Sequence, residues 1–241
     1  MRSAYLARRA ISESDGDAIG YHPGVTRPLT ILFIAATALS CAALVYLERI
    51  GLPGPAAAAK IVASTGFLAT AISAGALRSP FGRVLLAGLV LSWFGDVFLI
   101  GTTQTAFLYG LTAFLAAHLA YIAGFVIHGV ERRWVVMASV PLLAMAVLVS
   151  AWLTPHLASE LVVPVRIYTA VITLMVIAAI GARGHGAPGV VVIGALLFFG
   201  SDLSVAALRI VGTDFPTFVW GLPMYYAGQL CIAIGSGRRE T

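Results

Sequence analysis

A few ionisable side chains stand inside long apolar stretches of the sequence, where a charge is costly. A charged group at the centre of a bilayer costs about 2.5–3.5 kcal/mol on insertion scales, so such residues mark functional sites by default. Two are acids that follow aromatic residues and a glycine, Asp96 in WFGD (93–96) and Asp202 in FFGSD (198–202). The others are His118, Arg166 and Arg209, with Lys60 close to the start of another apolar stretch.

The two acids suggest chemistry, because a pair of buried carboxyl groups can divide acid and base work, as it does in glycosidases. A structural alternative remains, in which each carboxyl bonds to a neighbouring helix or pairs with Arg166 or Lys60. The matched depth of Asp96 and Asp202 favours the functional interpretation. His118 is balanced between a catalytic group and a satisfied interior histidine. Arg209, near a helix end, is interpreted as snorkelling to the interface, and Glu48 as solvated.

Uncharged polar residues add to the same layer of the membrane. His118 and Tyr121 share one helical face with Phe114, and Tyr225 shares a face with Gln229, because residues three, four or seven apart lie on one side of a helix. Tyr121 and Tyr168 are too deep to be interfacial belt residues. We therefore expect the polar groups to converge between the middle and the outer leaflet of the membrane.

These residues must be positioned by membrane-spanning helices. The chain has 241 residues, of which 60% are hydrophobic and 10% charged, whereas soluble domains carry roughly 25% charged residues. A helix needs about 20 apolar residues to cross the hydrocarbon. Apolar runs and Gly/Pro breakers predict an all-α bundle of eight transmembrane helices, over residues 28–47, 56–77, 84–100, 105–127, 134–153, 159–180, 190–211 and 217–235.

The placement of lysine and arginine predicts the orientation. With both termini cytoplasmic, eleven arginines fall on the cytoplasmic side, and only Arg49, Lys60, Arg166 and Arg209 fall elsewhere, as the positive-inside rule requires. We expect a disordered cytoplasmic tail at 1–27, one transmembrane domain at 28–235 and a cytoplasmic tail at 236–241. The tail at 1–27 has no apolar run and is not a cleavable signal peptide.

Several classes of function are excluded by the same sequence. The net charge of +5 is explained by arginines at helix ends facing lipid headgroups, so nucleic acid is not expected as a partner. Phosphate-binding loops, nucleophile elbows and helix-borne zinc motifs are absent. The two cysteines, Cys41 and Cys231, lie in apolar stretches and form no metal motif. We expect no metal and no cofactor.

The ordered set of polar motifs resembles the YhhN-like family, the lysoplasmalogenase family of integral membrane proteins. The resemblance covers roughly residues 28–235 and leaves the N-terminal tail outside. The residues that carry it are Lys60, Gly95-Asp96-Val97-Phe98-Leu99, Phe114, Ala117-His118, Tyr121, Tyr168, Met175, Gly194-Ala195, Phe198, Ser201-Asp202, Tyr225-Tyr226 and Gln229.

This resemblance implies hydrolysis of the vinyl ether bond of lysoplasmalogen-type lysolipids to a fatty aldehyde and a glycerophospho-alcohol. It makes Asp96 and Asp202 the catalytic pair. Protonation of the β-carbon of a vinyl ether needs a neutral acid, and an ionised partner would stabilise the resulting cation and activate water. We expect His118 to join the catalytic residues and Lys60 or Arg166 to hold the phosphate. The remaining substrate-binding residues are Tyr121, Tyr168, Tyr225 and Gln229.

Two rival functions remain open. Buried acids with a basic residue also describe a proton-coupled transporter of a small or lipid-like substrate, although the seventh predicted helix lacks an obvious break. A non-catalytic lipid sensor would bind without turnover. We favour the hydrolase and expect an integral multi-pass protein of a bacterial plasma membrane, with membrane lipid and a lysophospholipid substrate as partners and an oligomeric state left open.

Overall fold

The computed structural model describes residues 23–237, and within them it is helical, without strands. Eight helices are long and apolar enough to cross a membrane, as predicted. They are α2 (Pro23–Arg49), α3 (Pro53–Ala74), α4 (Pro80–Phe98), α5 (Gln104–His128), α6 (Arg132–Leu153), α7 (Ser159–Gly184), α8 (Gly189–Ala206) and α9 (Phe218–Ser236). Short turns η1 (Ala76–Arg78), η2 (Thr154–His156) and η3 (Ala207–Val211) extend three of the connections.

The predicted terminal tails fall largely outside the described residues. Residues 1–22 and 238–241 are not described, while helix α2 begins at Pro23 and α9 ends at Ser236. The predicted tails at 1–27 and 236–241 therefore remain predictions for those undescribed parts.

Local chemistry explains where the helices begin and end. Pro53 and Pro80 occupy the first turns of α3 and α4, where a missing N–H costs nothing. The hydroxyl of Ser79 accepts a hydrogen bond of 2.9 Å from the backbone N–H of Gly82 and caps α4. Gly75, with φ of 103°, ends α3 in the left-handed conformation that favours glycine.

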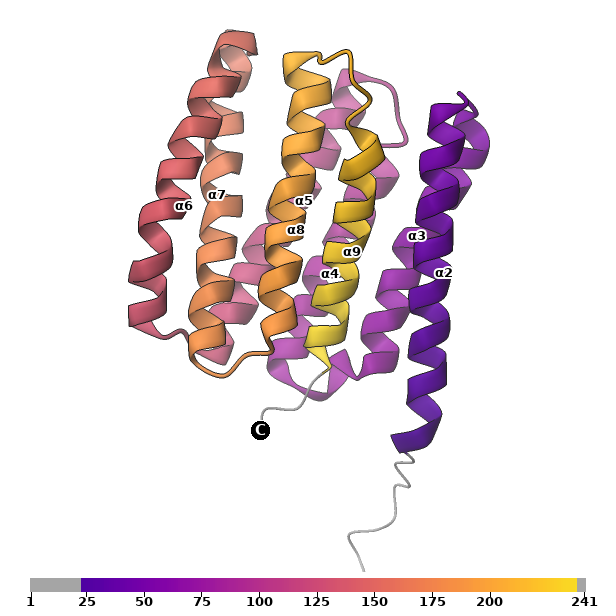
Figure 1. Ribbon diagram of the computed structural model, residues 1–241, viewed down its shortest axis with the longest axis vertical. Helices are drawn as coiled ribbons and strands as arrows, with labels where there is room; N and C mark the ends of the chain where they lie inside the picture. Colours follow the sequence, from indigo (N-terminus) through magenta and orange to yellow (C-terminus); the bar gives the residue numbers. More distant parts are fainter. Residues whose placement is uncertain (1–22, 238–241) are drawn as a thin grey trace, which may run out of the picture.

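Four helices form the centre of the bundle, and one pair of helices flanks this centre on each side (Figure 1). Helices α8 and α9 lie in front of α4 and α5, with α6 and α7 on one side and α2 and α3 on the other. Helix α3 packs against α9, and α5 packs against α7, which closes the bundle. The described part of the chain begins and ends at the same end of the bundle (Figure 1), as an even number of helices requires.

Glycines let the central helices approach each other. A Cβ on Gly194 of α8 would lie 2.8 Å from the carbonyl oxygen of Gly228 of α9, so this crossing needs residues without side chains. A Cβ on Gly95 would lie 2.8 Å from the ring of Phe114 of α5. Both contacts fix the rotation of helices that carry the candidate acids.

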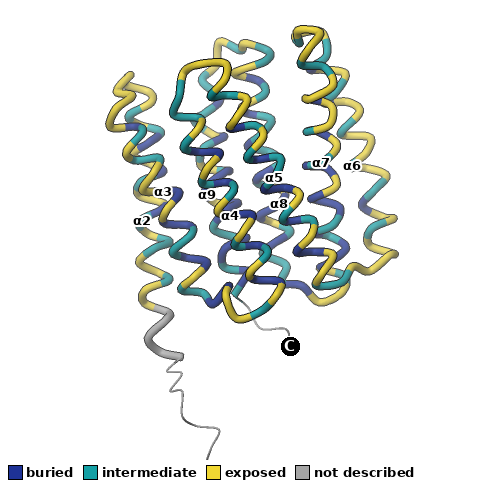
Figure 2. The backbone as a smooth tube through the Cα atoms, turned by 180° about the vertical axis from the view of Figure 1, so that it is seen from behind, coloured by how far each residue is buried: buried dark blue, intermediate teal, exposed yellow. Residues whose placement is uncertain are grey.

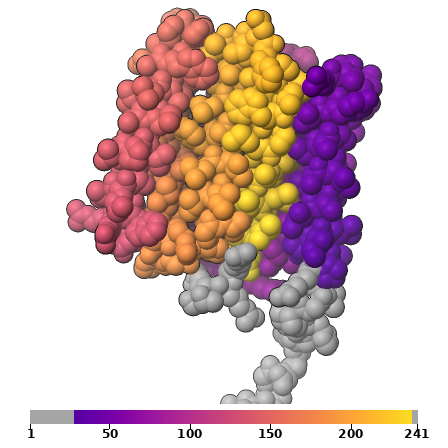
Figure 3. Space-filling view, viewed as in Figure 1, coloured from indigo at the N-terminus to yellow at the C-terminus, as the bar shows by residue number. Residues whose placement is uncertain are grey.

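The outer helices are covered mainly by exposed apolar side chains. Helices α2 and α6 are the least buried of the eight spans, and the yellow segments of Figure 2 follow their outer faces. Large exposed residues on α6 include Val140, Val147 and Leu148. The space-filling view shows α6, α8, α9 and α2 side by side over one face of the molecule (Figure 3). Such a surface suits a hydrocarbon environment.

Candidate active site

A cavity of about 580 Å³ is lined by residues from all eight helices. Five of the predicted site residues line it, namely Lys60, Asp96, Tyr168, Asp202 and Tyr225. They come from α3, α4, α7, α8 and α9, so residues far apart in sequence meet in one space. The acids lie in the C-terminal parts of α4 and α8, in the half of the bundle away from its described termini.

Asp96 is held by two hydroxyl groups from neighbouring helices. Its Oδ2 accepts a hydrogen bond of 2.5 Å from Ser64 Oγ and one of 2.8 Å from the Tyr225 hydroxyl. Ser64 also lies 3.3 Å from the hydroxyl of Tyr226, and Lys60 is near enough to act on Asp96 electrostatically. Both donors share one oxygen, which fixes the orientation of the carboxyl and leaves Oδ1 for other partners.

Asp202 has a different arrangement. Its Oδ2 accepts a hydrogen bond of 2.6 Å from the Tyr168 hydroxyl of α7. Nε2 of His118 lies 3.9 Å from the same oxygen, beyond hydrogen-bond distance. Asp202 is partly exposed, whereas Asp96 is buried. The two carboxyls of the candidate pair are therefore not equivalent.

His118 is fully buried and lacks hydrogen-bond partners. Neither ring nitrogen bonds to another described residue, and an orphaned buried polar group costs about 1–3 kcal/mol. The ring packs between aromatic side chains, 4.6 Å from the Phe198 ring and 5.3 Å from the Tyr168 ring, measured between centroids. His118 is therefore not a hydrogen-bonded interior histidine among the described residues.

A second polar group lies behind the cavity. The Tyr121 hydroxyl donates to Gln229 Oε1 at 2.9 Å and lies 3.3 Å from Ser92 Oγ. Tyr121 and Gln229 are fully buried and do not line the cavity. They support its wall rather than contact its contents.

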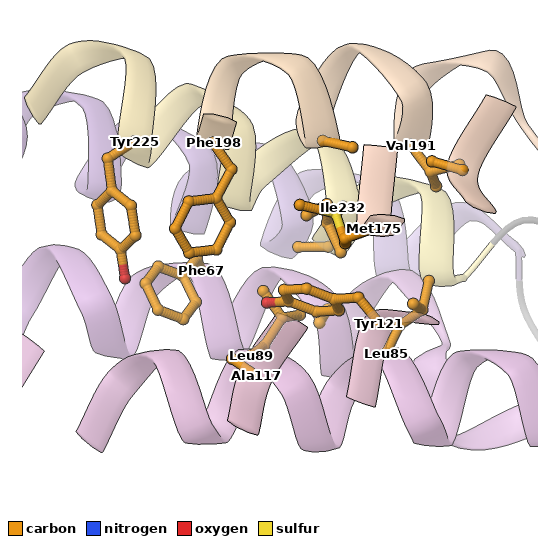
Figure 4. Close-up of a cluster of buried hydrophobic side chains, with 14 of the residues drawn as sticks. Phe67, Leu85, Leu89, Ala117, Tyr121, Met175, Val191, Phe198, Tyr225 and Ile232 are labelled. Atoms are coloured by element: carbon orange, nitrogen blue, oxygen red, sulfur yellow. The ribbon is translucent and has the colours of Figure 1, made fainter. Parts of the chain in front are cut away.

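Aromatic rings fill the space between these groups. The Phe198 and Tyr225 rings lie 5.4 Å apart and pack edge to face, and Figure 4 shows both above Phe67 of α3. Phe114 lies 5.8 Å from Tyr225 and 5.9 Å from Phe198. These rings keep the acids in an apolar surrounding.

The structure does not bring Arg166 into the site. Arg166 is exposed on α7, does not line the cavity, and donates from Nη2 to Thr154 Oγ1 at 3.4 Å. The expectation that it holds the phosphate is not supported, because its face of α7 points away from the cavity that Tyr168 lines.

Sequence reasoning missed three residues of the site. Ser64 was not singled out, although it lies four residues after Lys60 on the same face of α3. Glu48 and Arg209 were interpreted as solvated and snorkelling, yet both line the cavity. Both residues are also exposed. The seventh span, α8 with η3, also contains an irregular segment that the sequence did not reveal. This segment is η3, which is a π-helical turn.

Comparison with known proteins now decides the family. A model of the YhhN family matches residues 24–236. The chain belongs to the YhhN family. The resemblance inferred from the sequence is thereby confirmed, and the match spans every helix that lines the cavity.

Relatives of this family member have names that state an activity. The bovine protein named lysoplasmalogenase TMEM86A is 30% identical over 166 residues, which cover 66% of this chain and 68% of the relative. The Mycobacterium bovis protein named lysoplasmalogenase is 31% identical over 179 residues, covering 70% and 67%. The human protein named lysoplasmalogenase TMEM86A is 32% identical over 167 residues, covering 66% and 68%. No solved structure matches the chain. The predicted enzyme class agrees with these names.

Proposed function

We propose that this YhhN-family protein hydrolyses the vinyl ether bond of lysoplasmalogen-type lysolipids and releases a fatty aldehyde and a glycerophospho-alcohol. The observation that carries the proposal is that Asp96 and Asp202, from α4 and α8, line one largely apolar cavity. The names of the relatives support the substrate class.

The proposed reaction uses one carboxyl in its neutral form and the other as a carboxylate. The neutral acid donates its proton to the β-carbon of the vinyl ether, which leaves an oxocarbenium-like cation. The carboxylate stabilises the cation and takes a proton from the water that adds to it, giving a hemiacetal. The hemiacetal carbon–oxygen bond then breaks as a proton passes to the departing glycerol oxygen. The sum is one lysolipid and one water converted to one aldehyde and one alcohol.

Neighbouring residues have supporting roles in this proposal. The hydroxyl of Tyr168 orients Asp202, and the hydroxyls of Ser64 and Tyr225 orient Asp96. His118, with unbonded nitrogens next to Asp202, holds the reacting water. Preorganised groups of this kind need little rearrangement during the reaction.

Lys60 and the pair formed by Tyr121 and Gln229 complete the proposed site. The ammonium of Lys60, at the cavity wall near Asp96, offers a positive charge to the polar end of the lysolipid. Tyr121 and Gln229 keep the wall behind the cavity in place.

The test is aldehyde release from lysoplasmalogens by the purified protein in detergent. Asp96→Asn and Asp202→Asn are each expected to lower kcat by about 10²–10⁴-fold, the contribution typical of general acid–base groups. Asp214→Asn is the matched control, because Asp214 lies exposed in the α8–α9 connection. Full activity of either folded site variant would refute the aspartate mechanism.

The same assay separates the hydrolase from the transporter. A detergent solution holds no gradient, so a proton-coupled carrier would release no product there. Binding of lysolipid without aldehyde would instead indicate a lipid sensor.

We also propose that both termini are cytoplasmic and that the cavity opens at the opposite face of a bacterial plasma membrane. The distribution of basic residues supports this orientation. The end of the described bundle near its termini holds Arg78, Arg83, Arg132, Arg133 and Arg183. The test is labelling of Thr102→Cys and of Glu131→Cys from outside intact cells, each in a protein whose Cys41 and Cys231 are replaced by serine. Labelling at position 131 and not at position 102 would show the opposite orientation.

A further inference from the structure

Arg209 occupies an unusual position beside the candidate site. It lies in η3, the π-helical turn that continues α8 beyond Asp202, and such turns are frequent at functional sites. Its side chain lines the main cavity and also a smaller neighbouring cavity of about 170 Å³. Arg209 therefore stands where the two cavities adjoin.

The spacing from Asp202 to Arg209 suits a lysolipid. Seven residues along a helix put the two backbone positions roughly 10 Å apart along the axis, and both residues line the same cavity although a π-helical turn begins between them. The phosphorus of a lysolipid is five bonds of about 1.5 Å from the ether oxygen, or roughly 6 Å when extended. The flexible stem of an arginine bridges the remaining few ångströms.

The guanidinium of Arg209 is oriented but not neutralised. It lies over the Phe107 ring, 5.7 Å from the centroid. Within residues 23–237 it has no carboxylate at salt-bridge distance, since the one such pair there joins His118 and Asp202. A planar guanidinium matches the oxygens of a phosphate in two parallel hydrogen bonds.

The smaller cavity provides hydroxyl, amide and imidazole groups beside Arg209. Its wall includes Thr102, Thr103, Gln104 and His156. Hydroxyl and amide groups both donate and accept hydrogen bonds, so they fit a small alcohol or an aminoalcohol.

We propose that Arg209 binds the phosphate of the lysolipid and that the smaller cavity receives the alcohol esterified to that phosphate. This assignment rests on the proposed hydrolase function and adds the residue that recognises the polar end of the substrate. The sequence had suggested Lys60 or Arg166 for this role.

The first experiment compares two vinyl ether substrates, an alkenyl-glycerophosphoethanolamine and an alkenylglycerol without phosphate. Arg209→Gln is expected to raise KM for the phosphorylated substrate by about 10–100-fold, the cost of losing a hydrogen bond to a charged group. It should leave KM for the alkenylglycerol unchanged. The KM of Arg209→Lys for the phosphorylated substrate should lie between those of wild type and Arg209→Gln, because lysine keeps the charge but lacks the planar guanidinium.

Arg49→Gln serves as the control, because Arg49 is exposed at the same end of the bundle and lines neither cavity. It should change neither KM. An equal effect of Arg209→Gln on both substrates, or no effect on either, would overturn the assignment.

A binding experiment separates this inference from the proposed hydrolysis. The probes are an ester lysophosphatidylethanolamine and a monoacylglycerol, followed by tryptophan fluorescence in detergent. Selective loss of lysophosphatidylethanolamine binding in Arg209→Gln would support the phosphate site even if no substrate released aldehyde. Equal binding of lysophosphatidylethanolamine by wild type and Arg209→Gln would refute the phosphate site.

Soluble competitors distinguish a headgroup site from a general anion site. Glycerophosphoethanolamine should displace the lysolipid from wild type more strongly than inorganic phosphate does. Equal displacement by inorganic phosphate would contradict the role of the smaller cavity.

Discussion

Two tyrosine hydroxyls offer the sharpest test of how the acids are positioned. Tyr168 donates to Asp202 at 2.6 Å, and Tyr225 donates to Asp96 at 2.8 Å. Asp96 has a second donor, Ser64, at 2.5 Å. Tyr→Phe at either position removes one oxygen and keeps the ring, so the aromatic packing of the cavity is preserved.

The two variants should differ in severity. Hydrogen bonds to charged groups contribute about 1.5–3 kcal/mol, and 1.36 kcal/mol is tenfold in rate. Tyr168→Phe removes the hydroxyl that donates to Asp202 at 2.6 Å. We expect it to lower kcat by roughly 10–100-fold. Tyr225→Phe leaves Asp96 held by Ser64 and should cost less than about tenfold.

The assay is aldehyde release with kcat and KM determined separately, with thermal unfolding in detergent as the check on folding. Combining Tyr225→Phe with Ser64→Ala should cost more than the product of the single effects, because the two donors share one oxygen and each substitutes for the other. The reasoning fails if Tyr168→Phe keeps kcat within twofold of wild type, or if Tyr225→Phe is the more damaging variant.

Three further predictions concern packing, capping and the buried histidine. Gly194→Val should lower the unfolding free energy by about 1–3 kcal/mol, because its side chain would meet the Gly228 carbonyl oxygen. A melting temperature equal to that of wild type would contradict the close crossing of α8 and α9. Ser79→Ala should cost about 0.5–2 kcal/mol by removing the cap of α4, and Ser79→Asp, which can restore the cap, should recover it in the same melting experiment. His118→Phe keeps an aromatic ring in the aromatic cluster and should fold, yet lower kcat at least tenfold if His118 holds the reacting water. A kcat of His118→Phe equal to that of wild type would show that His118 serves in packing and not in the reaction.

The number of helices and the position of each acid along its helix were readable from the sequence. Both depend on local quantities, since a span is an apolar run of about 20 residues and an acid such as Asp96 or Asp202 is conspicuous against an apolar background. Their order along the chain also carried the family resemblance. Breakers such as Pro53 and Pro80 set the helix starts within a few residues.

The sequence left Lys60 or Arg166 open as the phosphate-binding residue, and it did not determine whether Arg166 or Arg209 faces the cavity. Both lie near the same end of the bundle, and either could have faced the cavity. Membrane helices of this chain are apolar on most sides, so they lack the one-sided pattern that reveals the buried face of a soluble helix. Ser64 was overlooked for the same reason, because a serine on an apolar helix gives no sign of which neighbour it meets.

Tertiary structure decided these orientations through close, non-local contacts. Glycines such as Gly95 and Gly194 fix the rotation of α4 and α8 against α5 and α9, and with it the direction in which Asp96 and Asp202 point. The π-helical turn then places Arg209 at the rim of the cavity. The sequence by itself determined the number of spans and where along each span the polar groups lie. Only the packing of helices distant in sequence determined which of them meet, because helix rotation is set by contacts and not by local hydropathy.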